Sequence, residues 1–202
     1  MKGIFVTIEG IDGSGKSTQM QLVANRLRES GYEVIITHEP TKRRIGSIIK
    51  EHYLINPNSI PEVDALLYAA DRIEHYNLDV RPKLDQNYIV LTDRYVISSI
   101  VYQGAQGVEI NWIKEINKMV PLPDLSIILE IPIEIAINRL DSTDKQIEKF
   151  ENYSWLEKLS KIYQSIELGK IKRINGNLPI NEVTTSLVDL ILKEIKLINS
   201  SS

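Results

Sequence analysis

Eight residues near the start of the chain have the types and the spacing of a phosphate-binding loop. Residues 10–17 read Gly-Ile-Asp-Gly-Ser-Gly-Lys-Ser and fit the pattern G-x-x-x-x-G-K-[ST]. Gly13 and Gly15 allow the backbone to curl around a phosphate without a Cβ clash. We expect Lys16 to reach the β- and γ-phosphates of a nucleoside triphosphate, and the hydroxyl of Ser17 to ligate Mg²⁺.

A strand before the loop and a helix after it, which a phosphate-binding loop of this type requires, are both expected from the sequence. Residues 3–8 form an apolar, β-branched run that predicts a buried strand. After the loop, Met20, Val23 and Leu27 recur at helical spacing. The N-terminus of that helix would direct backbone N–H groups and the positive end of its dipole at an anion. A chance match in a glycine-rich turn is the weaker interpretation.

A second group of polar residues follows a later strand, expected over residues 88–92. That strand ends in Asp93-Arg94. P-loop proteins place a carboxylate associated with Mg²⁺ at such a strand end, and ligands of open α/β sheets bind at this edge. A buried Asp–Arg ion pair that fixes a turn is the structural alternative. Further polar groups at helical spacing have the types that line a pocket: Ser98, Ser99, Tyr102, Gln103 and Gly104.

A helix expected over roughly residues 61–79 carries an aromatic residue and an arginine together. Tyr68 and Arg72 lie one turn apart, nearly opposite an apolar stripe that we expect to be buried. That stripe comprises Val63, Leu66, Leu67, Ala70 and Ile73. Taken alone, the position of the pair favours a solvated helix face over a binding site.

The remaining pattern alternates strands with helices. Strands are expected over residues 33–37, 125–130 and 171–174, and helices over 133–140, around 155–166 and over 180–197. This order predicts a single domain, residues 1–202, with a parallel sheet of about five strands covered by helices on both faces. The polar segment 141–151, with Lys145 and Lys149, predicts an exposed loop or a lid, and residues 199–202 predict a flexible tail.

Composition limits the classes of function. A chain of 202 residues with 43% hydrophobic and 25% charged residues is typical of a globular protein. The net charge of −3 gives no electrostatic reason to expect nucleic-acid binding, and no apolar run reaches the length of a membrane span. Cysteine is absent, and the N-terminus runs straight into the first strand without a signal peptide. These features favour the cytoplasm.

Four separated segments resemble the thymidylate kinase family, P-loop nucleoside monophosphate kinases that make dTDP and ADP from dTMP and ATP. These segments are Glu9–Thr18, His38–Pro40, Leu66–Arg72 and Asp93–Gly104. Many kinases and NTPases share the first segment, whereas its combination with Asp93-Arg94-Tyr95 and Tyr102-Gln103-Gly104 is much more specific. The resemblance spans nearly the whole chain and implies the three-layer P-loop NTPase fold with a short mobile lid.

The resemblance also implies roles on the dTMP side. Tyr68 would stack on the thymine ring, and Arg72 would hydrogen-bond a base carbonyl. Arg94 would hold the dTMP phosphate through its planar guanidinium fork, and Asp12 would meet the 3′-hydroxyl. Tyr102 would crowd the 2′ position and disfavour ribonucleotides. Further contacts to dTMP are implied for Glu39, Ser99 and Gln103.

On the ATP side, the resemblance implies that Arg139 lies against the adenine, with the loop 175–179 on its other side. Lys16, Arg94 and Asp93 would be catalytic, and Ser17 with Asp93 would hold Mg²⁺, directly or through water. ATP would be bound by the phosphate loop as a whole: Gly10, Gly13, Ser14, Gly15, Lys16, Ser17 and Thr18. The resemblance further implies a homodimer.

Two departures from the family pattern concern cations. Many members have arginine where this chain has His38, so Arg43 or Arg44 would have to replace a phosphate-contacting group. Where some members have a catalytic arginine in the phosphate loop, this chain has Gly13 and Ser14. The lid would then supply Lys145 or Lys149, and lysine lacks the bidentate fork of arginine.

Two other functions fit the phosphate loop. One is a kinase of the same fold that acts on another nucleoside or nucleoside monophosphate, since the thymine methyl contributes only about 1–3 kcal/mol of discrimination. The other is a GTPase-type switch that binds a partner protein. Against the switch, the guanine-specifying Asn-Lys-x-Asp is missing, because Asn117-Lys118 is followed by Met119 and Val120.

Overall fold

The centre of the molecule is a sheet of five parallel strands. The computed structural model describes residues 2–53, 59–141 and 153–200. The strand order is β2-β3-β1-β4-β5, and every neighbouring pair is parallel. The strands are β1 (Ile4–Glu9), β2 (Val34–His38), β3 (Ile89–Asp93), β4 (Leu125–Glu130) and β5 (Ile171–Asn175). The predicted three-layer parallel fold is confirmed, with strand ends displaced by one residue at most.

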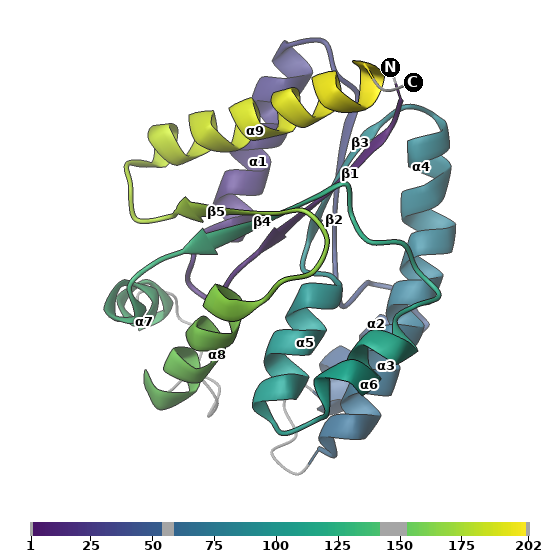
Figure 1. Ribbon diagram of the computed structural model, residues 1–202, viewed down its shortest axis with the longest axis vertical. Coiled ribbons are helices and arrows are strands. Elements are labelled where there is room, and N and C mark those ends of the chain that lie inside the picture. Colours follow the sequence, from purple (N-terminus) through teal and green to yellow (C-terminus); the bar gives the residue numbers. More distant parts are fainter. Residues whose placement is uncertain (1, 54–58, 142–152, 201–202) are drawn as a thin grey trace.

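Helices cover both faces of this sheet (Figure 1). On one face, α1 (Lys16–Glu29) and α9 (Ile180–Ser200) pack against each other and against alternate residues of the central strands, such as Val6 and Leu91. On the other face, α5 (Val96–Ala105), α6 (Ile110–Ile116), α7 (Ile133–Asp141) and α8 (Tyr153–Ser165) contribute to a second core that includes Phe5 and Val90. Because the central strands are buried on both sides, they are almost continuously apolar.

The long connection between β2 and β3 brings the remaining helices to the second face. It contains α2 (Arg44–Ile48), a π-helical turn over Ile49–Tyr53, α3 (Pro61–His75), a second π-helical turn over Tyr76–Val80, and α4 (Arg81–Asp85). The helix predicted over 61–79 is therefore correct in position, and it continues through a π-helical turn into α4.

The predicted buried stripe of α3 is only partly correct, because Ile73 packs against the second core but no member of the stripe is fully buried. Leu66, assigned to the apolar stripe, has 49% of its surface exposed. The face that is buried carries polar and small residues instead: Asp64, Ala65, Ala69, Asp71, Arg72 and His75. The reason is that α3 packs on the loop after β2 and on the start of α5, and its polar side chains form hydrogen bonds with residues of both segments.

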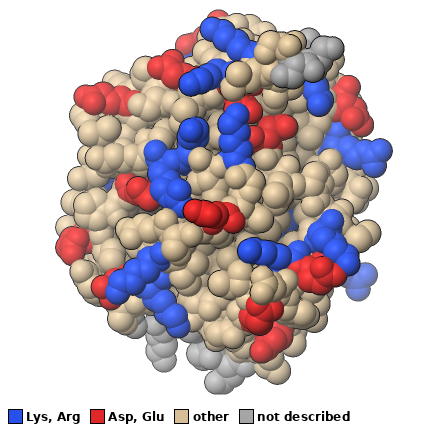
Figure 2. Space-filling view, in the orientation of Figure 1, with Lys and Arg blue, Asp and Glu red and all other residues tan. Residues whose placement is uncertain are grey.

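At the C-terminus, α9 runs through Ser200, and Asn199 Oδ1 accepts a hydrogen bond from the backbone N–H of Lys2 at 3.1 Å. The first two residues of the predicted tail, 199–202, are thus helical, and the last two lie outside the described residues. No helix in the described ranges is long and apolar enough to cross a membrane. On the face shown in Figure 2, basic and acidic side chains are interspersed.

Candidate active site

The phosphate loop connects β1 to α1, and its glycines are required by its shape. Gly13 has φ 77°, and a Cβ at this position would lie 2.5 Å from the backbone oxygen of Ala136. Gly15 has φ 91° and forms the N-cap of α1. An L-residue at Gly13 would therefore meet both backbone strain and a clash with α7. The loop is closed by a hydrogen bond from Ser14 N–H to the oxygen of Ile11 at 3.2 Å.

Lys16 lies folded back over this loop. Its Nζ donates hydrogen bonds to the backbone oxygens of Gly10 and Ile11, both at 3.0 Å, and the residue is buried. Burial lowers the pKa of Lys16, and the neighbouring Arg94 cation lowers it further, whereas Asp12 and Asp93 oppose the shift. The Lys16 ammonium group thus contacts the backbone of the loop and interacts electrostatically with Arg94, Asp12 and Asp93.

Ser17 and Asp93 provide oxygen ligands for a divalent cation. The exposed hydroxyl of Ser17 lies 3.5 Å from Asp93 Oδ2, although the residues are 76 positions apart in the chain. The other carboxylate oxygen, Asp93 Oδ1, is buried and has no hydrogen-bond partner among the described residues. A buried carboxylate oxygen without a donor, beside a hydroxyl, fits Mg²⁺, which prefers oxygen ligands.

Arg94 is held in a strained backbone conformation at the end of β3. Its φ of 68° is rare for a residue other than glycine, and its N–H donates to the backbone oxygen of Ile8 at 3.2 Å. The guanidinium donates to Asp12 Oδ1, to the Tyr102 hydroxyl at 3.0 Å and to Ser98 Oγ at 3.3 Å. The guanidinium of Arg94 is thus fixed against the phosphate loop.

Asp12 completes this cluster from inside the phosphate loop. The Tyr102 hydroxyl donates to its Oδ2 at 2.9 Å, and Arg94 pairs with its Oδ1. Burial alone would raise the pKa of Asp12, but the cations of Arg94 and Lys16 and the hydrogen bond from Tyr102 outweigh burial and lower that pKa to about 2. Asp12 is therefore ionised at neutral pH and links the loop to α5.

Arg72 is buried rather than solvated, with 1% of its surface exposed. Its guanidinium donates to Glu39 Oε2 at 2.8 Å, to Asn117 Oδ1, and through Nη2 to the backbone oxygen of Tyr95 and to Ser99 Oγ, both at 3.1 Å. Glu39 follows β2 and Ser99 belongs to α5, so this arginine joins three separate segments. The solvated helix face that the spacing of Tyr68 and Arg72 favoured is wrong for Arg72.

Tyr68 lies on the same side of α3, half-buried. Burial raises the pKa of its phenol, and the charges of Arg94, Asp64, Arg72 and Asp12 also act on it. The positive charges of both arginines thus favour the ionised phenol, although burial outweighs them. In the same region, the buried Gln103 has a side-chain oxygen, Oε1, without a hydrogen-bond partner in the described chain.

Two residues next to this cluster were not singled out as binding residues by sequence reasoning. His75 contacts Glu39 through Nδ1 at 2.9 Å, and Asn117 accepts from Arg72. The signal for His75 was present, because it lies three residues after Arg72 and therefore on the same side of the helix. Asn117 follows α6, and nothing in its local sequence points to Arg72.

The two segments expected around adenine both lie against the phosphate loop. Arg139 donates through Nη1 to the backbone oxygen of Gly13 at 3.3 Å. In the loop 175–179, a Cβ on Gly176 would lie 3.4 Å from the backbone oxygen of Ser14. Thr18 is exposed in the first turn of α1. The predicted lid lysines, Lys145 and Lys149, lie outside the described residues.

Neither arginine proposed to replace the group missing at His38 is the cation beside that histidine. Arg43 forms a bidentate ion pair with Asp79 at 2.7 and 2.8 Å, and Arg44 is exposed. It is Lys50 whose Nζ lies 3.4 Å from His38 Nε2, while donating to the backbone oxygen of Thr41 at 3.1 Å. No local pattern singles out Lys50, which lies in the π-helical turn after α2.

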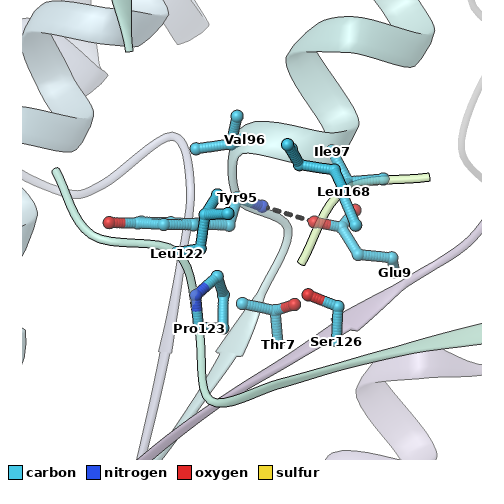
Figure 3. A pocket seen from close by; sticks show the side chains of 9 residues that line it. All are labelled: Thr7, Glu9, Tyr95, Val96, Ile97, Leu122, Pro123, Ser126 and Leu168. Atoms are coloured by element: carbon cyan, nitrogen blue, oxygen red, sulfur yellow. Dashed lines mark hydrogen bonds between the residues drawn. The ribbon is translucent and has the colours of Figure 1, made fainter. Parts of the chain in front are cut away.

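Behind this cluster, a small pocket separates β1 and β4 from the start of α5 (Figure 3). Glu9 projects into it and accepts hydrogen bonds from Tyr95 N–H at 2.8 Å and from Ser98 Oγ at 2.6 Å. Burial raises the pKa of Glu9. The space is too narrow for a water molecule, and Leu122, Pro123 and Leu168 close it, so the pocket belongs to the packing beneath the site.

The phosphate loop lies between the oxygen atoms of Ser17 and Asp93 and the fixed guanidinium group of Arg94. This arrangement is typical of a P-loop phosphotransferase with a second, anionic substrate. The family described as Thymidylate kinase matches residues 8–187. The chain belongs to the thymidylate kinase family. The predicted resemblance and the activity of an ATP-dependent nucleoside monophosphate kinase, a transferase, are therefore confirmed.

Individual relatives agree with this assignment. A protein of Pyrobaculum calidifontis named "Probable thymidylate kinase" is 43% identical over 93% of this chain and 95% of its own length. One of the same name from Caldivirga maquilingensis is 41% identical over 96% of this chain and 95% of its own. A "Thymidylate kinase" of Desulfotalea psychrophila is 35% identical over 96% and 97%, respectively.

Proposed function

We propose that the chain transfers the γ-phosphoryl group of ATP to dTMP, giving dTDP and ADP, and that one kinase domain spans residues 1–202. The observation that carries this proposal is the ion pair between Asp12 of the phosphate loop and Arg94 at the end of β3. It makes the triphosphate loop and the arginine cluster two sides of one site. Phosphoryl transfer needs such adjacency, because donor and acceptor must lie in line.

On the triphosphate side, the loop amides, Lys16 and Arg139 would bind ATP. Lys16 would leave the oxygens of Gly10 and Ile11 for the β- and γ-phosphates, an exchange that costs little because its present partners are neutral carbonyls. Ser17 and Asp93 would hold Mg²⁺, directly or through water, and the ion would neutralise phosphate charge. The orphaned Asp93 Oδ1 supports this assignment.

On the monophosphate side, the donors and acceptors match a thymine base. The hydrogen bonds of Arg72 use four of its five N–H groups, which leaves one on Nη1 without an acceptor in the described part of the chain. A pyrimidine carbonyl would take this donor, and Gln103 Oε1 is an acceptor of the kind that a ring N–H requires. Stacking on Tyr68 would add about 0.5–1.5 kcal/mol beyond the area buried.

The phosphate of dTMP would meet Arg94, whose fork matches two phosphate oxygens. Asp12 would then be free to accept from the 3′-hydroxyl, and Tyr102, which now contacts both residues, would stand at the 2′ position. No covalent intermediate is needed, since positioning and charge neutralisation by Lys16 and Arg94 supply the catalysis. We propose that residues 141–151 close over the phosphates and thereby exclude water, and that Lys145 or Lys149 supplies a further cation on closure.

The setting of the enzyme is also a proposal. A cytoplasmic homodimer that binds neither nucleic acid nor membrane agrees with the family resemblance, with the net charge of −3 and with the interspersed surface charges (Figure 2). Exposed apolar side chains at the start of α3, Ile60 at 59% and Leu66 at 49%, suit burial between copies.

Steady-state kinetics with Mg²⁺, ATP and each of dTMP, dUMP, dCMP and thymidine test the proposal. We expect the highest kcat/KM for dTMP, a kcat/KM for dUMP that is lower by about 5- to 160-fold because the methyl is missing, and little activity on thymidine. Arg94→Met should lower kcat/KM for dTMP far more than it changes KM for ATP. Arg26→Met, whose arginine bonds Thr185 on the opposite face, is the control. A preference for thymidine over dTMP would refute the assignment.

A further inference from the structure

Four side chains form a continuous chain of contacts that ends at Arg72, and three of them, His75, Glu39 and Arg72, are fully buried. The Thr37 hydroxyl lies 2.8 Å from His75 Nε2, and His75 Nδ1 lies 2.9 Å from Glu39 Oε1. The other carboxylate oxygen, Glu39 Oε2, accepts from Arg72 Nε at 2.8 Å. The side chains of His75, Glu39 and Arg72 expose 0%, 2% and 1% of their surfaces, so water supplies none of these hydrogen bonds.

We propose that His75 is a positioning residue for base recognition: it fixes the Glu39 carboxylate, which in turn fixes the guanidinium of Arg72 for the pyrimidine. The inference rests on the proposed function, because it names a determinant of dTMP binding at the same site. The hydrogen bonds of His75 within the described residues go to Thr37 and Glu39, neither of which belongs to the phosphate loop.

The direction of the hydrogen bonds follows from what each group can donate. Glu39 is an acceptor when ionised, so Nδ1 of His75 must carry the proton that it shares with Oε1. The hydroxyl of Thr37 can donate to Nε2 or accept from it, so both ring nitrogens of His75 have a hydrogen-bond partner. The Glu39 carboxylate thus places a proton on Nδ1, and Thr37 completes the hydrogen bonds of the ring at Nε2.

The effect on Arg72 follows from its need for fixed acceptors. Asn117 holds Nη1, and Tyr95 and Ser99 hold Nη2, whereas the acceptor of Nε in the described residues is Glu39 Oε2, which also lies 2.8 Å from Nη2. If His75 loses its donor, Oε1 of a buried carboxylate is left without a hydrogen bond. The Glu39 carboxylate can then turn towards other donors, so that Arg72 Nε loses its acceptor. The guanidinium is then no longer held in one orientation, and neither is the Nη1–H that would bind the pyrimidine.

A separate contact keeps this effect local. Thr41 donates to Asp71 through its backbone N–H at 2.8 Å and through its hydroxyl at 2.6 Å. These bonds attach the loop after β2 to α3 independently of His75. We therefore expect the fold to survive a change at His75 while the orientation of Arg72 does not.

The test compares His75→Leu with His75→Asn in the full-length enzyme. Leucine fills the space without a donor, whereas the side-chain NH₂ of asparagine stands where Nδ1 stands now. His75→Leu should raise KM for dTMP about tenfold, within the range expected for a buried acceptor left unsatisfied, and should lower the ratio of kcat/KM for dTMP over dCMP. KM for ATP should stay unchanged, and His75→Asn should restore most of the loss. Equal losses in both variants, or a parallel rise in KM for ATP, would overturn the proposal.

Thr37→Val provides a milder variant if His75→Leu does not fold. It removes only the hydroxyl opposite Nε2 and should raise KM for dTMP about threefold, the loss of one ordinary hydrogen bond. Thr185→Val makes the same chemical change on the exposed side of α9 and should change nothing. An unchanged KM for dTMP in Thr37→Val would also overturn the proposal. A wild-type enzyme that does not phosphorylate dTMP would instead refute the proposed function.

Discussion

Replacing Asp12 by asparagine should destabilise the folded protein by an amount that depends on pH. Asparagine has nearly the same shape as aspartate but carries no charge. Its oxygen can still accept from Arg94, so the change removes the attraction between the charges while keeping most of the geometry. The ion pair is part of the site, and its contribution to stability can be worked out from the pKa of Asp12.

The magnitude follows from the two states of the carboxyl group. Burial raises the pKa of Asp12, but Arg94 and Lys16 prevail and lower it from 3.8 to about 2. A difference of about 1.8 in pKa corresponds to about 2.4 kcal/mol, because a change of one in pKa corresponds to about 1.36 kcal/mol. The Asp12 side chain is 35% exposed, so water screens the pair. We therefore expect a loss of about 1 kcal/mol at pH 7.

The sign of the pH dependence is fixed because the folded-state pKa lies below the unfolded one. A group of this kind contributes its full stability above the unfolded pKa and loses it as the pH falls through the folded pKa. Asparagine does not titrate. The difference in the free energy of unfolding between wild type and Asp12→Asn should therefore be constant from pH 7 to about 5. It should shrink towards zero between about pH 4 and pH 2.

Urea unfolding followed by tryptophan fluorescence at several pH values between 7 and 3 measures this difference. The matched control is Asp189→Asn, an exposed position on α9. We expect the control to match wild type throughout. If the cost of Asp12→Asn were the same at pH 3 as at pH 7, or absent at pH 7, the ion pair with Arg94 would not be what lowers the pKa of Asp12.

Two further variants probe the phosphate loop. Lys16→Ala should reduce phosphoryl transfer by at least about a hundredfold without loss of the fold, because it removes the charge that faces the phosphates, and turnover near the wild-type rate would contradict this role. Gly13→Ala should weaken ATP binding and lower the unfolding midpoint in urea, because its Cβ would lie 2.5 Å from the oxygen of Ala136 at φ 77°. A KM for ATP equal to that of the wild type in Gly13→Ala would contradict this expectation, because it would show that the loop tolerates the added methyl group.

Local sequence was sufficient to predict the frame of the molecule. The strands β1, β3 and β4 are runs of apolar residues buried on both faces, which period and length identify without knowledge of the partners. The phosphate loop is equally local, since its glycines, lysine and serine form one continuous segment between a strand and a helix. Such features depend on neighbours in the sequence, so the sequence alone contains them.

The polar side of α3 could not be predicted in this way. A rule that places apolar residues inside assigns Leu66 to the core and Arg72 to solvent, and both assignments are wrong. Arg72 is buried because Glu39, 33 residues before it, and Asn117, 45 residues after it, are brought to it by other elements. A hydrophobic pattern contains no information on partners at such distances in the chain.

The same reasoning explains why the cation beside His38 could not be identified from the sequence. Charge alone made Arg43 a candidate substitute, yet Asp79 takes up its guanidinium and ties the start of α2 to the turn after α3. Lys50 instead donates to Thr41, whose side chain and N–H are bound by Asp71. Asp71 of α3 and Asp79 of the following turn therefore each fix part of the segment after β2. Because that loop carries Glu39, the orientation of Arg72 depends on these long-range pairs, and base selectivity should respond to residues that never contact the base.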